Sequence, residues 1–377
     1  MSRVPARRLS LFGRVSSTIV FFFLGGLQAV SAGPIYSVQI LGALTGASSA
    51  TAINGSGTGV GFITNTAGDQ VPVLFNGQTT TLPGIGQANG INASGTVVGT
   101  TYSNNAPTVT TWVGGQSQSL GISGYGTAIN DSGQIVGGYI TPAGQLNAFE
   151  YKGGTLVNLG TLGGGWSSAY GINASGQIVG YSLTGAGVFA AFLSNGNGMT
   201  NLCPGCTSNS YAYAVNSSGT AVGSFVTNSG FLHASEYSNG NVTDLGTLGG
   251  FESVAYGIND SGEVVGLSYL SDNSTMQAFL YSNDVMIDLD SLLPVGSGWD
   301  ISAAYGINNA GDILAVGSLN GQDYAVALDP TLKSAMKSVS LNEPLAVPEP
   351  APMFLTAGAL AFLGARFWVR RRSQLTH

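Results

Sequence analysis

A short phrase, Ile-Asn-x-Ser-Gly-x-x-Val-Gly, recurs along the chain and constrains its fold more than any other feature. Six copies are clear, and a looser seventh, GINNAGDILAVG, ends at Gly317. One asparagine marks each copy: Asn54, Asn92, Asn130, Asn173, Asn216, Asn259 and Asn308. Successive markers are 38, 38, 43, 43, 43 and 49 residues apart. Such a period predicts a repeat protein in which each copy forms one supersecondary unit.

Each phrase predicts a β-hairpin. In the fourth copy, the apolar segment Ala169–Ile172 leads into Asn173–Gly176, and a second strand, Gln177–Tyr181, follows. Asn and Ser side chains can bond the backbone across such a turn, and Gly accepts the positive φ that a short hairpin demands. Two further strands follow in most copies, as at Ala148–Gly154 and Leu156–Gly164. Four short strands in about 43 residues predict a propeller blade; a β-solenoid, with shorter coils, is the alternative.

The seventh copy lacks a fourth strand. It runs through a third strand at Tyr324–Leu328 and then stops, whereas Val38–Gly46 aligns without gaps with the fourth strand of the fifth copy, Val242–Gly250. We therefore predict an all-β fold, a seven-bladed β-propeller over residues 33–330, in which the N-terminal strand completes the last blade. This closure would remove exposed sheet edges.

The first 32 residues predict a signal peptide. Arg3, Arg7, Arg8 and Arg14 precede the apolar core Thr18–Val30, and small residues lead to a cleavage site after Ala32. The chain is therefore expected to cross the inner membrane, with signal peptidase as a partner during maturation.

The C-terminal end, residues 347–373, predicts a second address signal after a linker at 331–346. Its motif residues are Val347, Pro348, Glu349 and Pro350, followed after an apolar stretch by Arg370, Arg371 and Arg372. The apolar run Met353–Ala365 is thirteen residues long before Arg366 interrupts it. A permanent membrane span needs roughly 20 residues, so a transient helix is favoured over a plain membrane anchor, which is the alternative.

This tail resembles the PEP-CTERM sorting signal of Gram-negative bacteria. The resemblance implies an exosortase as partner, transient membrane anchoring, release to the cell surface or medium, and an association with exopolysaccharide and biofilm matrix. The repeats, over Ile35–Leu328, resemble the HAF-repeat family of bacterial extracellular proteins. The His-Ala-Phe triplet that names the family is absent, and His233-Ala234-Ser235 is a near form of it. The resemblance therefore implies only that the Ala-Phe pair of the third strand packs in the core.

Charge excludes one class of partner. Every arginine lies at Arg14 or earlier or at Arg366 or later, and the basic residues between are Lys152, Lys333 and Lys337. Of the 18 acidic residues all but Glu349 lie between the two signals, which leaves a formal charge of 3 − 17 = −14 there. A nucleic acid binder needs clustered Lys and Arg, so nucleic acid is excluded, and anionic lipid heads are disfavoured.

Metal and redox sites have few candidates. Cys203 and Cys206 form C-P-G-C where other copies carry Leu-Gly-Thr-Leu, which predicts a small structural disulfide in an oxidising compartment. A redox dithiol and half a zinc site are the alternatives. Asp131, Asp260 and Asp312, near the hairpin turns, would offer oxygens to Ca²⁺ or bond turn amides; the second reading is favoured, and no cofactor is predicted.

No catalytic constellation is visible. Glycosidase chemistry needs paired carboxylates, and spacing does not pair the available glutamates, Glu150, Glu236, Glu252 and Glu263. Aromatic side chains suited to stacking on sugars are Trp112, Trp166, Trp299 and Tyr305. We expect a non-catalytic extracellular protein that binds glycan, matrix or another surface protein, or serves a structural role there. A polysaccharide hydrolase or lyase is the alternative, which carboxylates clustered around the channel would favour.

Overall fold

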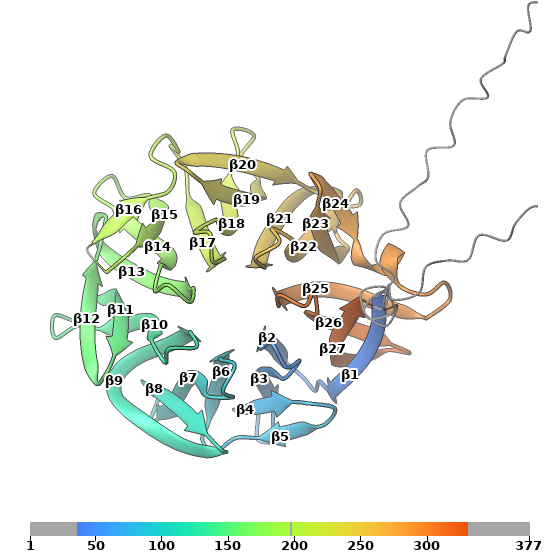
Figure 1. Cartoon of the computed structure of the whole chain (residues 1–377), viewed down its shortest axis with the longest axis horizontal. Coiled ribbons are helices and arrows are strands. Elements are labelled where there is room, and N and C mark those ends of the chain that lie inside the picture. Colours follow the sequence, from blue (N-terminus) through green and yellow to red (C-terminus); the bar gives the residue numbers. More distant parts are fainter. Residues whose placement is uncertain (1–35, 197, 331–377) are drawn as a thin grey trace, which may run out of the picture. The chain divides into compact units, whose positions relative to one another are not determined.

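The computed structural model describes residues 36–196 and 198–330, which form 27 strands and one short 3₁₀-helix (Figure 1). The predicted signal peptide, the linker and the sorting signal, including Val347–Pro350 and Arg370–Arg372, lie outside these residues. Within the described ranges, no helix has the length and apolarity needed to cross a membrane.

Every repeat begins with an inner hairpin, and the Asn-x-Ser-Gly phrase forms its turn. The hairpins pair β2 (Ser49–Ile53) with β3 (Gly59–Thr64), β6 (Gly86–Ile91) with β7 (Val97–Ser103), β9 (Gln116–Ile129) with β10 (Ile135–Ile140), β13 (Gly163–Ile172) with β14 (Ile178–Thr184), β17 (Ser210–Val215) with β18 (Ala221–Val226), β21 (Gly249–Ile258) with β22 (Val264–Leu270), and β25 (Trp299–Ile307) with β26 (Ile313–Leu319). The first strand of each hairpin lies nearest the centre of the ring (Figure 1). The predicted hairpins are confirmed.

Two further strands continue each repeat outward. They are β4 (Gln70–Phe75) and β5 (Thr79–Thr81), β8 (Ala106–Val113) and the first half of β9, β11 (Leu146–Lys152) and β12 (Thr155–Gly160), β15 (Phe189–Ser194) and β16 (Met199–Asn201), β19 (Leu232–Ser238) and β20 (Asn241–Gly246), β23 (Met276–Ser282) and β24 (Val285–Asp288), and finally β27 (Gln322–Pro330) with β1 (Tyr36–Ala43). The 3₁₀-helix η1 (Leu289–Leu292) follows β24. Radial antiparallel sheets around a common centre make the fold an all-β propeller.

The prediction of seven separate four-stranded sheets is wrong at one junction. Five sheets have four strands, but the second and third repeats share one sheet of seven. Strand β9 pairs with β8 through Gln116–Ser123 and with β10 through Gly124–Ile129. Gly121 of the second repeat stands where the first repeat has Pro83. The N–H of Gly121 donates to Ser119 Oγ at 3.2 Å and makes no bond in the ladder, so the N–H that Pro83 lacks does not account for the difference between the two repeats.

The hairpin turn is held together by its asparagine. In the fourth repeat, Asn173 Oδ1 accepts the N–H groups of Ser175 and Gln177 at 3.1 and 2.9 Å. The N–H of Gly176 also donates to the carbonyl oxygen of Asn173 at 3.1 Å, with φ of 82° at this glycine. This conformation favours glycine, which explains the fixed Gly of the phrase.

The seven marker asparagines also form a closed ring of hydrogen bonds. The side-chain amide of each one donates to the backbone carbonyl oxygen of the next: Asn54 to Asn92 at 3.2 Å, Asn92 to Asn130 at 3.2 Å, Asn130 to Asn173 at 3.0 Å, Asn173 to Asn216 at 2.8 Å, Asn216 to Asn259 at 3.3 Å, Asn259 to Asn308 at 3.3 Å, and Asn308 to Asn54 at 3.2 Å. All seven are buried. Each amide therefore joins its own turn to that of its neighbour, which is a reason for the repeat to keep asparagine here.

The predicted closure by the N-terminal strand is confirmed. Strand β1 pairs antiparallel with β27, and Gly42 lies opposite Ala325 as Gly246 lies opposite Ala234 in the fifth repeat. The alignment of Val38–Gly46 with Val242–Gly250 thus gave the correct register. Leu41, at the bulge of β1, is 1% exposed and packs in a cluster with residues of both the first and the last repeat.

The core lies between neighbouring repeats as seven small clusters of buried side chains. The Ala-Phe pairs of the third strands are fully buried, as the resemblance implied: Ala148 and Phe149, Ala191 and Phe192, and Ala278 and Phe279. Small residues on one sheet and a phenylalanine ring on the next allow the sheets to approach closely.

Candidate functional site

The inner strand of every repeat carries a β-bulge three residues before its marker asparagine. In the fourth repeat, for example, Ala169 pairs with Gly180 and Gly171 with Val179, which leaves Tyr170 unpaired. The seven bulge residues are Thr51, Asn89, Thr127, Tyr170, Tyr213, Tyr256 and Tyr305. Bulges re-aim side chains and are frequent beside functional sites.

In the first three repeats the bulge residue is small and bonds the adjacent repeat. Thr51 Oγ1 donates to the carbonyl oxygen of Ala88 at 2.8 Å, and Thr127 Oγ1 donates to that of Ala169 at 2.9 Å. Asn89 Nδ2 donates to the carbonyl oxygen of Gly126 at 2.7 Å. These three side chains therefore link the inner strands of adjacent repeats by hydrogen bonds.

In the last four repeats the bulge residue is tyrosine, and the rings contact one another from repeat to repeat. Ring centroids are 5.7 Å apart for Tyr170 and Tyr213, 5.7 Å for Tyr213 and Tyr256, and 5.4 Å for Tyr256 and Tyr305. All four rings are half-buried. We call these four residues the tyrosine arc; it follows the inner strands β13, β17, β21 and β25 (Figure 1).

Four more aromatic rings extend the arc outward over the fourth and fifth repeats. Tyr181 stacks on Tyr170 at 4.9 Å, and Trp166 stacks on Tyr181 at 5.2 Å. Phe189 and Tyr211 meet Tyr181 edge-on at 5.7 and 4.9 Å. The hydroxyl groups of Tyr170 and Tyr181 are 2.9 Å apart and hydrogen-bonded. Eight contiguous rings are thereby held in fixed orientations.

Burial favours the neutral form of three phenols of this array. Burial raises the pKa of Tyr256 to about 12, and the neighbouring Tyr305 adds to that shift. Burial also raises the pKa of Tyr213 and of Tyr181 well above the ordinary tyrosine value. A neutral phenol both donates and accepts a hydrogen bond, so the array offers aromatic faces and hydroxyl groups without charge.

The acidic residues near the hairpin turns bond turn amides. Asp131 Oδ1 accepts the N–H of Ala93 at 2.8 Å, and Asp260 Oδ1 accepts the N–H of Ser217 at 2.8 Å. This backbone hydrogen bond lowers the pKa of Asp260. Asp312 Oδ2 accepts from Asn308 Nδ2 at 2.9 Å. Among residues 36–196 and 198–330, no group of three His, Cys, Asp or Glu side chains is placed to hold a metal ion.

The four glutamates considered for glycosidase chemistry lie in three repeats, with Glu252 and Glu263 both in the sixth. Glu150 on β11 accepts a hydrogen bond from Gln134 at 2.6 Å. Glu236 on β19 lies near Asp284, and burial followed by this neighbour raises the pKa of Glu236. Glu252 is exposed on β21, and Glu263 accepts from Asn259 Nδ2 at 2.7 Å.

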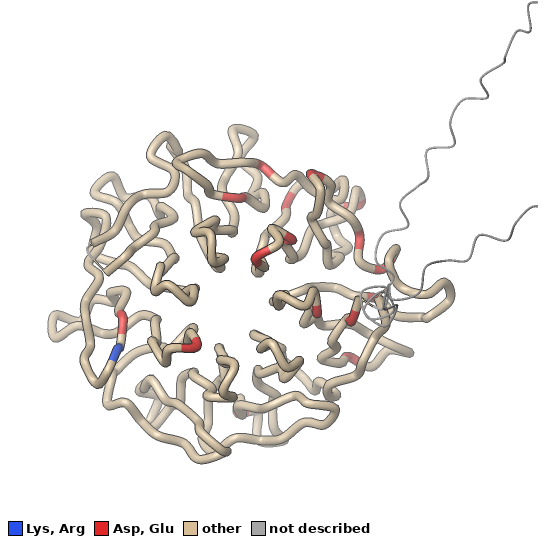
Figure 2. The backbone as a smooth tube through the Cα atoms, in the orientation of Figure 1, with Lys and Arg blue, Asp and Glu red and all other residues tan. Residues whose placement is uncertain are grey.

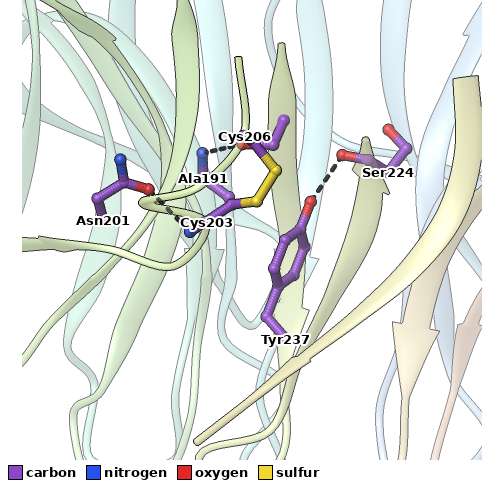
Figure 3. Close-up of a disulfide and its surroundings, with 7 residues drawn as sticks. Ala191, Asn201, Cys203, Cys206, Ser224 and Tyr237 are labelled. Carbon is purple, nitrogen blue, oxygen red and sulfur yellow. Dashed lines mark hydrogen bonds between the residues drawn. A yellow bond between two sulfur atoms is a disulfide. The ribbon is translucent and has the colours of Figure 1, made fainter. Parts of the chain in front are cut away.

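Cys203 and Cys206 are joined by a disulfide with their Cα atoms 5.3 Å apart (Figure 3). The N–H of Cys203 donates to Asn201 Oδ1 at 2.8 Å, as the N–H of Gly160 donates to Asn158 Oδ1 at 2.9 Å. Cys203 therefore occupies the position of Gly160, one residue along from the predicted slot of Leu159. The bridge closes a four-residue turn beside the buried Tyr237.

The four aromatic residues proposed for sugar stacking lie in different environments. Trp112 is 1% exposed, and its Nε1 donates to the carbonyl oxygen of Pro83 at 2.9 Å, so it packs the core. Trp299 packs edge-on against Tyr324 in the last repeat. Trp166 and Tyr305 belong to the aromatic array. The other members were missed, although tyrosine three residues before the marker asparagine in four successive repeats is a visible signal.

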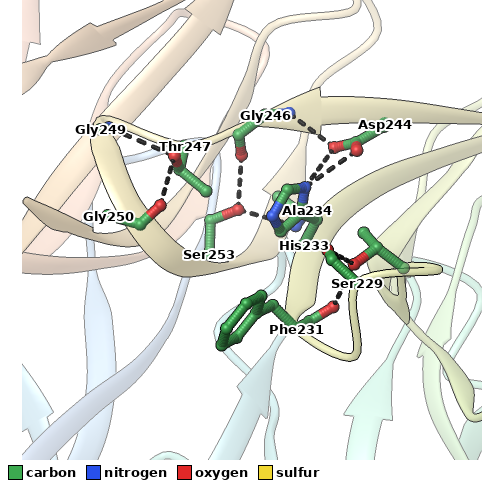
Figure 4. A network of polar contacts seen from close by, with 11 residues as sticks. Ser229, Phe231, His233, Ala234, Asp244, Gly246, Thr247, Gly249, Gly250 and Ser253 are labelled. Atoms are coloured by element: carbon green, nitrogen blue, oxygen red, sulfur yellow. Dashed lines mark hydrogen bonds and ion pairs between the residues drawn. The ribbon is translucent and has the colours of Figure 1, made fainter. Parts of the chain in front are cut away.

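His233, the histidine at the position of the family triplet, lies beside Asp244 (Figure 4). Its Nδ1 is 2.9 Å from Asp244 Oδ2. The third repeat has Asn147 and Asn158 at the same two positions, with Nδ2 of the first donating to Oδ1 of the second at 3.2 Å. A polar pair between the third and fourth strands therefore recurs where no histidine is present.

No protein-family model matches the chain, and no curated protein matches it significantly. Among solved structures, it is similar to TolB from Acinetobacter baumannii at 14% identity and a TM-score of 0.45, covering 61% of this chain and 62% of that one. A putative TolB from Agrobacterium tumefaciens matches at 14% identity and a TM-score of 0.45 over 72% and 97% of the two chains. The Aleuria aurantia lectin matches at 10% identity and a TM-score of 0.38 over 70% and 98%. At these sequence identities and TM-scores, the structural similarities do not assign a function to this chain.

Proposed function

We propose that this protein is a non-catalytic extracellular binding protein and that the aromatic array contacts a neutral saccharide. The observation that carries the proposal is the tyrosine arc, four half-buried rings in contact at one bulge position of consecutive repeats. The C–H face of a pyranose ring packs on an aromatic face, and tyrosine hydroxyl groups can bond sugar hydroxyls at the same time.

The charge distribution supports a neutral ligand. Lys152 is the one Lys or Arg within residues 36–196 and 198–330, and acidic residues gather on the fifth to seventh repeats (Figure 2). Anionic saccharides would be repelled by this surface, and it has few cations to pair with their carboxylates or sulfates.

We also propose that the ring has seven blades and that β9 contributes its first half to one blade and its second half to the next. The seven links of the asparagine ring support this count, because one link joins the two turns carried by the shared sheet. A ring of this kind holds the bulge tyrosines at a regular spacing along the inner strands.

Two features disfavour the hydrolase or lyase alternative. The array contains no carboxylate, and Asp131, Asp260 and Asp312 near the inner turns are engaged with amide groups. Retaining glycosidases require two carboxyl groups about 5 Å apart, and inverting ones a separation of about 6.5–9.5 Å. We therefore expect saccharide to be bound and released unchanged.

The substitution that tests this proposal is Tyr256→Thr. Threonine already occupies the equivalent bulge in the first and third repeats, so the strand can accept it. The purified protein would be titrated with neutral glucose, galactose and mannose oligosaccharides by calorimetry, and reducing ends would be followed in the same samples. We expect binding by the wild type, at least ten-fold weaker binding at the tyrosine arc in the variant, and no new reducing ends.

Tyr269→Thr, on β22 and outside the arc, is the matched control and should bind as the wild type does. Absence of binding by the wild type, equal affinity of the Tyr256→Thr variant, or release of reducing ends would each overturn the proposal.

We also propose that the protein is exported and is processed by an exosortase at Val347–Pro350. The supporting observations are the two terminal signals of the sequence. Mass spectrometry of the protein recovered from the cell surface or medium of the native host would test this. The expected mass lacks residues 1–32 and the arginines Arg370–Arg372; a protein that retains those arginines would contradict it.

A further inference from the structure

A second pair of aromatic rings lies away from the tyrosine arc. Phe231, between β18 and β19, and Phe251, on β21, stack with their centroids 4.6 Å apart and their planes at 15°. Their side chains are 36% and 53% exposed. Two phenylalanine rings from adjacent repeats are thus held in contact while much of their surface faces water, which costs free energy unless a ligand covers it.

An open depression of about 430 Å³ lies on the hairpin that also carries Phe231. Its lining residues are Phe225, Thr227, Asn228, Ser229, His233 and Asp244, so neither ring of the stack is part of the lining. Phe231 lies two residues from both Ser229 and His233, on the same hairpin (Figure 4). The hairpin is fixed by the backbone bond from Thr227 N–H to the carbonyl oxygen of Phe231 at 2.9 Å.

The imidazole in the depression is held in one orientation. Asp244 binds His233 Nδ1 through both carboxylate oxygens, at 3.0 and 2.9 Å, and its Oδ1 also accepts the N–H of Gly246 at 2.8 Å. The carboxylate therefore orients the ring, and in the neutral imidazole Nδ1 carries the proton while Nε2 accepts. Within the described part of the chain, Nε2 has no hydrogen-bond partner.

This polar pair differs from its counterpart in the third repeat at the third-strand position. Asn147 is 8% exposed, whereas the His233 side chain is 21% exposed, and the fourth-strand partners Asn158 and Asp244 are exposed in both repeats. The recurring link between the third and fourth strands explains why a polar pair exists. It does not explain why the fifth repeat has an imidazole there, at the wall of a depression.

We propose that this depression binds one pyranose unit of a neutral glycan. The exposed surface of the Phe231–Phe251 stack takes the C–H face of the sugar, while His233 Nε2 and the free lone pairs of Asp244 receive its hydroxyl groups. The combination of an apolar platform and a few fixed polar groups is typical of small-ligand sites. The ligand class rests on the proposed function, but the location is independent of the tyrosine arc.

The test follows His233 directly. The sequence has two histidines, His233 and His377, so the ¹³C-labelled chain gives two imidazole signals before cleavage at Val347–Pro350 and the His233 signal alone after it. The purified chain would be titrated with neutral glucose, galactose and mannose hexasaccharides and with a galacturonate hexasaccharide. We expect a saturable shift of the His233 signal with at least one neutral sugar and none with the galacturonate.

In the Phe251→Ala variant, the sugar affinity measured from the shift of the His233 signal should be at least ten-fold weaker. Val285→Ala, which truncates an apolar side chain that is 55% exposed on β24, is the matched control and should leave it unchanged. The Tyr256→Thr variant should retain the shift, since it alters the other site. Melting curves of each variant would establish that it is folded.

The outcomes separate this site from the proposed function. Binding of neutral sugar without a shift of His233, a shift unaffected by Phe251→Ala, or a shift induced by the galacturonate would overturn the second site alone. No binding of any neutral sugar would overturn both proposals. A His233 shift with unchanged affinity of the Tyr256→Thr variant in calorimetry would support this site against the arc.

Discussion

The side-chain amide of Asn308 donates to the carbonyl oxygen of Asn54 at 3.2 Å, although the two residues are 254 positions apart. This bond joins the last repeat to the first and completes the asparagine ring. Together with the pairing of β1 and β27, it ties the two ends of the repeat array at its inner and outer edges.

Replacing Asn308 by alanine should destabilise the protein by about 1–3 kcal/mol, because buried turn amides lose their acceptor along with the inter-repeat bond. The N–H groups affected are those of Ala310 and Asp312, each 2.9 Å from Asn308 Oδ1. Urea unfolding would measure this. Gln118→Ala, which truncates an exposed amide on β9, is the control, and equal midpoints for both variants would contradict the structural role of the ring.

Leu41→Ala should cost about 2–5 kcal/mol, because it leaves a cavity among buried side chains of the first and last repeats. Ile40→Ala on the same strand removes a side chain that is 43% exposed and should change stability little. Thermal unfolding of the two variants compares them directly. Equal melting temperatures would argue that β1 does not close the ring.

The acidity of Asp290 predicts a pH dependence of stability. Burial, followed by the charges of Asp288 and Asp300, raises the pKa of Asp290 from 3.8 to about 6. The folded state therefore favours the protonated acid, and the resulting stabilisation, complete below about pH 4, is lost as the pH rises through about 6. Asp290→Asn keeps an acceptor for the N–H of Ile301, which is now 2.9 Å from Asp290 Oδ1.

This variant should melt at a higher temperature than the wild type at pH 7 and at a similar temperature at pH 4. Asp329→Asn removes an exposed carboxylate on β27 and controls for net charge. A uniform shift of the melting temperature at both pH values would indicate that the titration of Asp290 is not the cause.

Removing the disulfide with Cys203→Ser and Cys206→Ser should cost about 2 kcal/mol, the chain-entropy value for so short a loop. The effect should be local to the fifth-repeat boundary, so hydrogen exchange should increase in β16 and in the turn after it, and not in β1. An unchanged exchange pattern would show that the bridge does not constrain this turn.

Much of the fold could be predicted because the repeat phrase carries its own turn chemistry. Asn173 and Gly176 define the hairpin, and the gap-free alignment of Val38–Gly46 gives the closing register. The merging of two sheets through β9 was missed, since the segment that joins them, Leu120–Ser123, lies outside the repeat phrase and closely resembles the segment of the first repeat that ends its sheet.

The candidate sites were harder to predict. The contacts of Tyr213 with Tyr170 and Tyr256 join residues 43 positions apart, and they depend on the ring curvature and on the bulges that re-aim each side chain. The stack of Phe231 on Phe251 likewise joins two repeats at positions that the phrase does not mark. The spacing of the repeat phrase predicts the length of each repeat, but it does not predict these contacts between side chains of adjacent repeats.

Saccharide binding by the aromatic array is tested most directly by a crystal structure of the protein soaked with a neutral oligosaccharide that binds in calorimetry. We expect a pyranose ring packed on the tyrosine arc, with its C–H face over Tyr213 or Tyr256 and its glycosidic bonds intact. Saccharide bound away from all eight rings of the array, or cleaved at a pair of carboxylates, would contradict it.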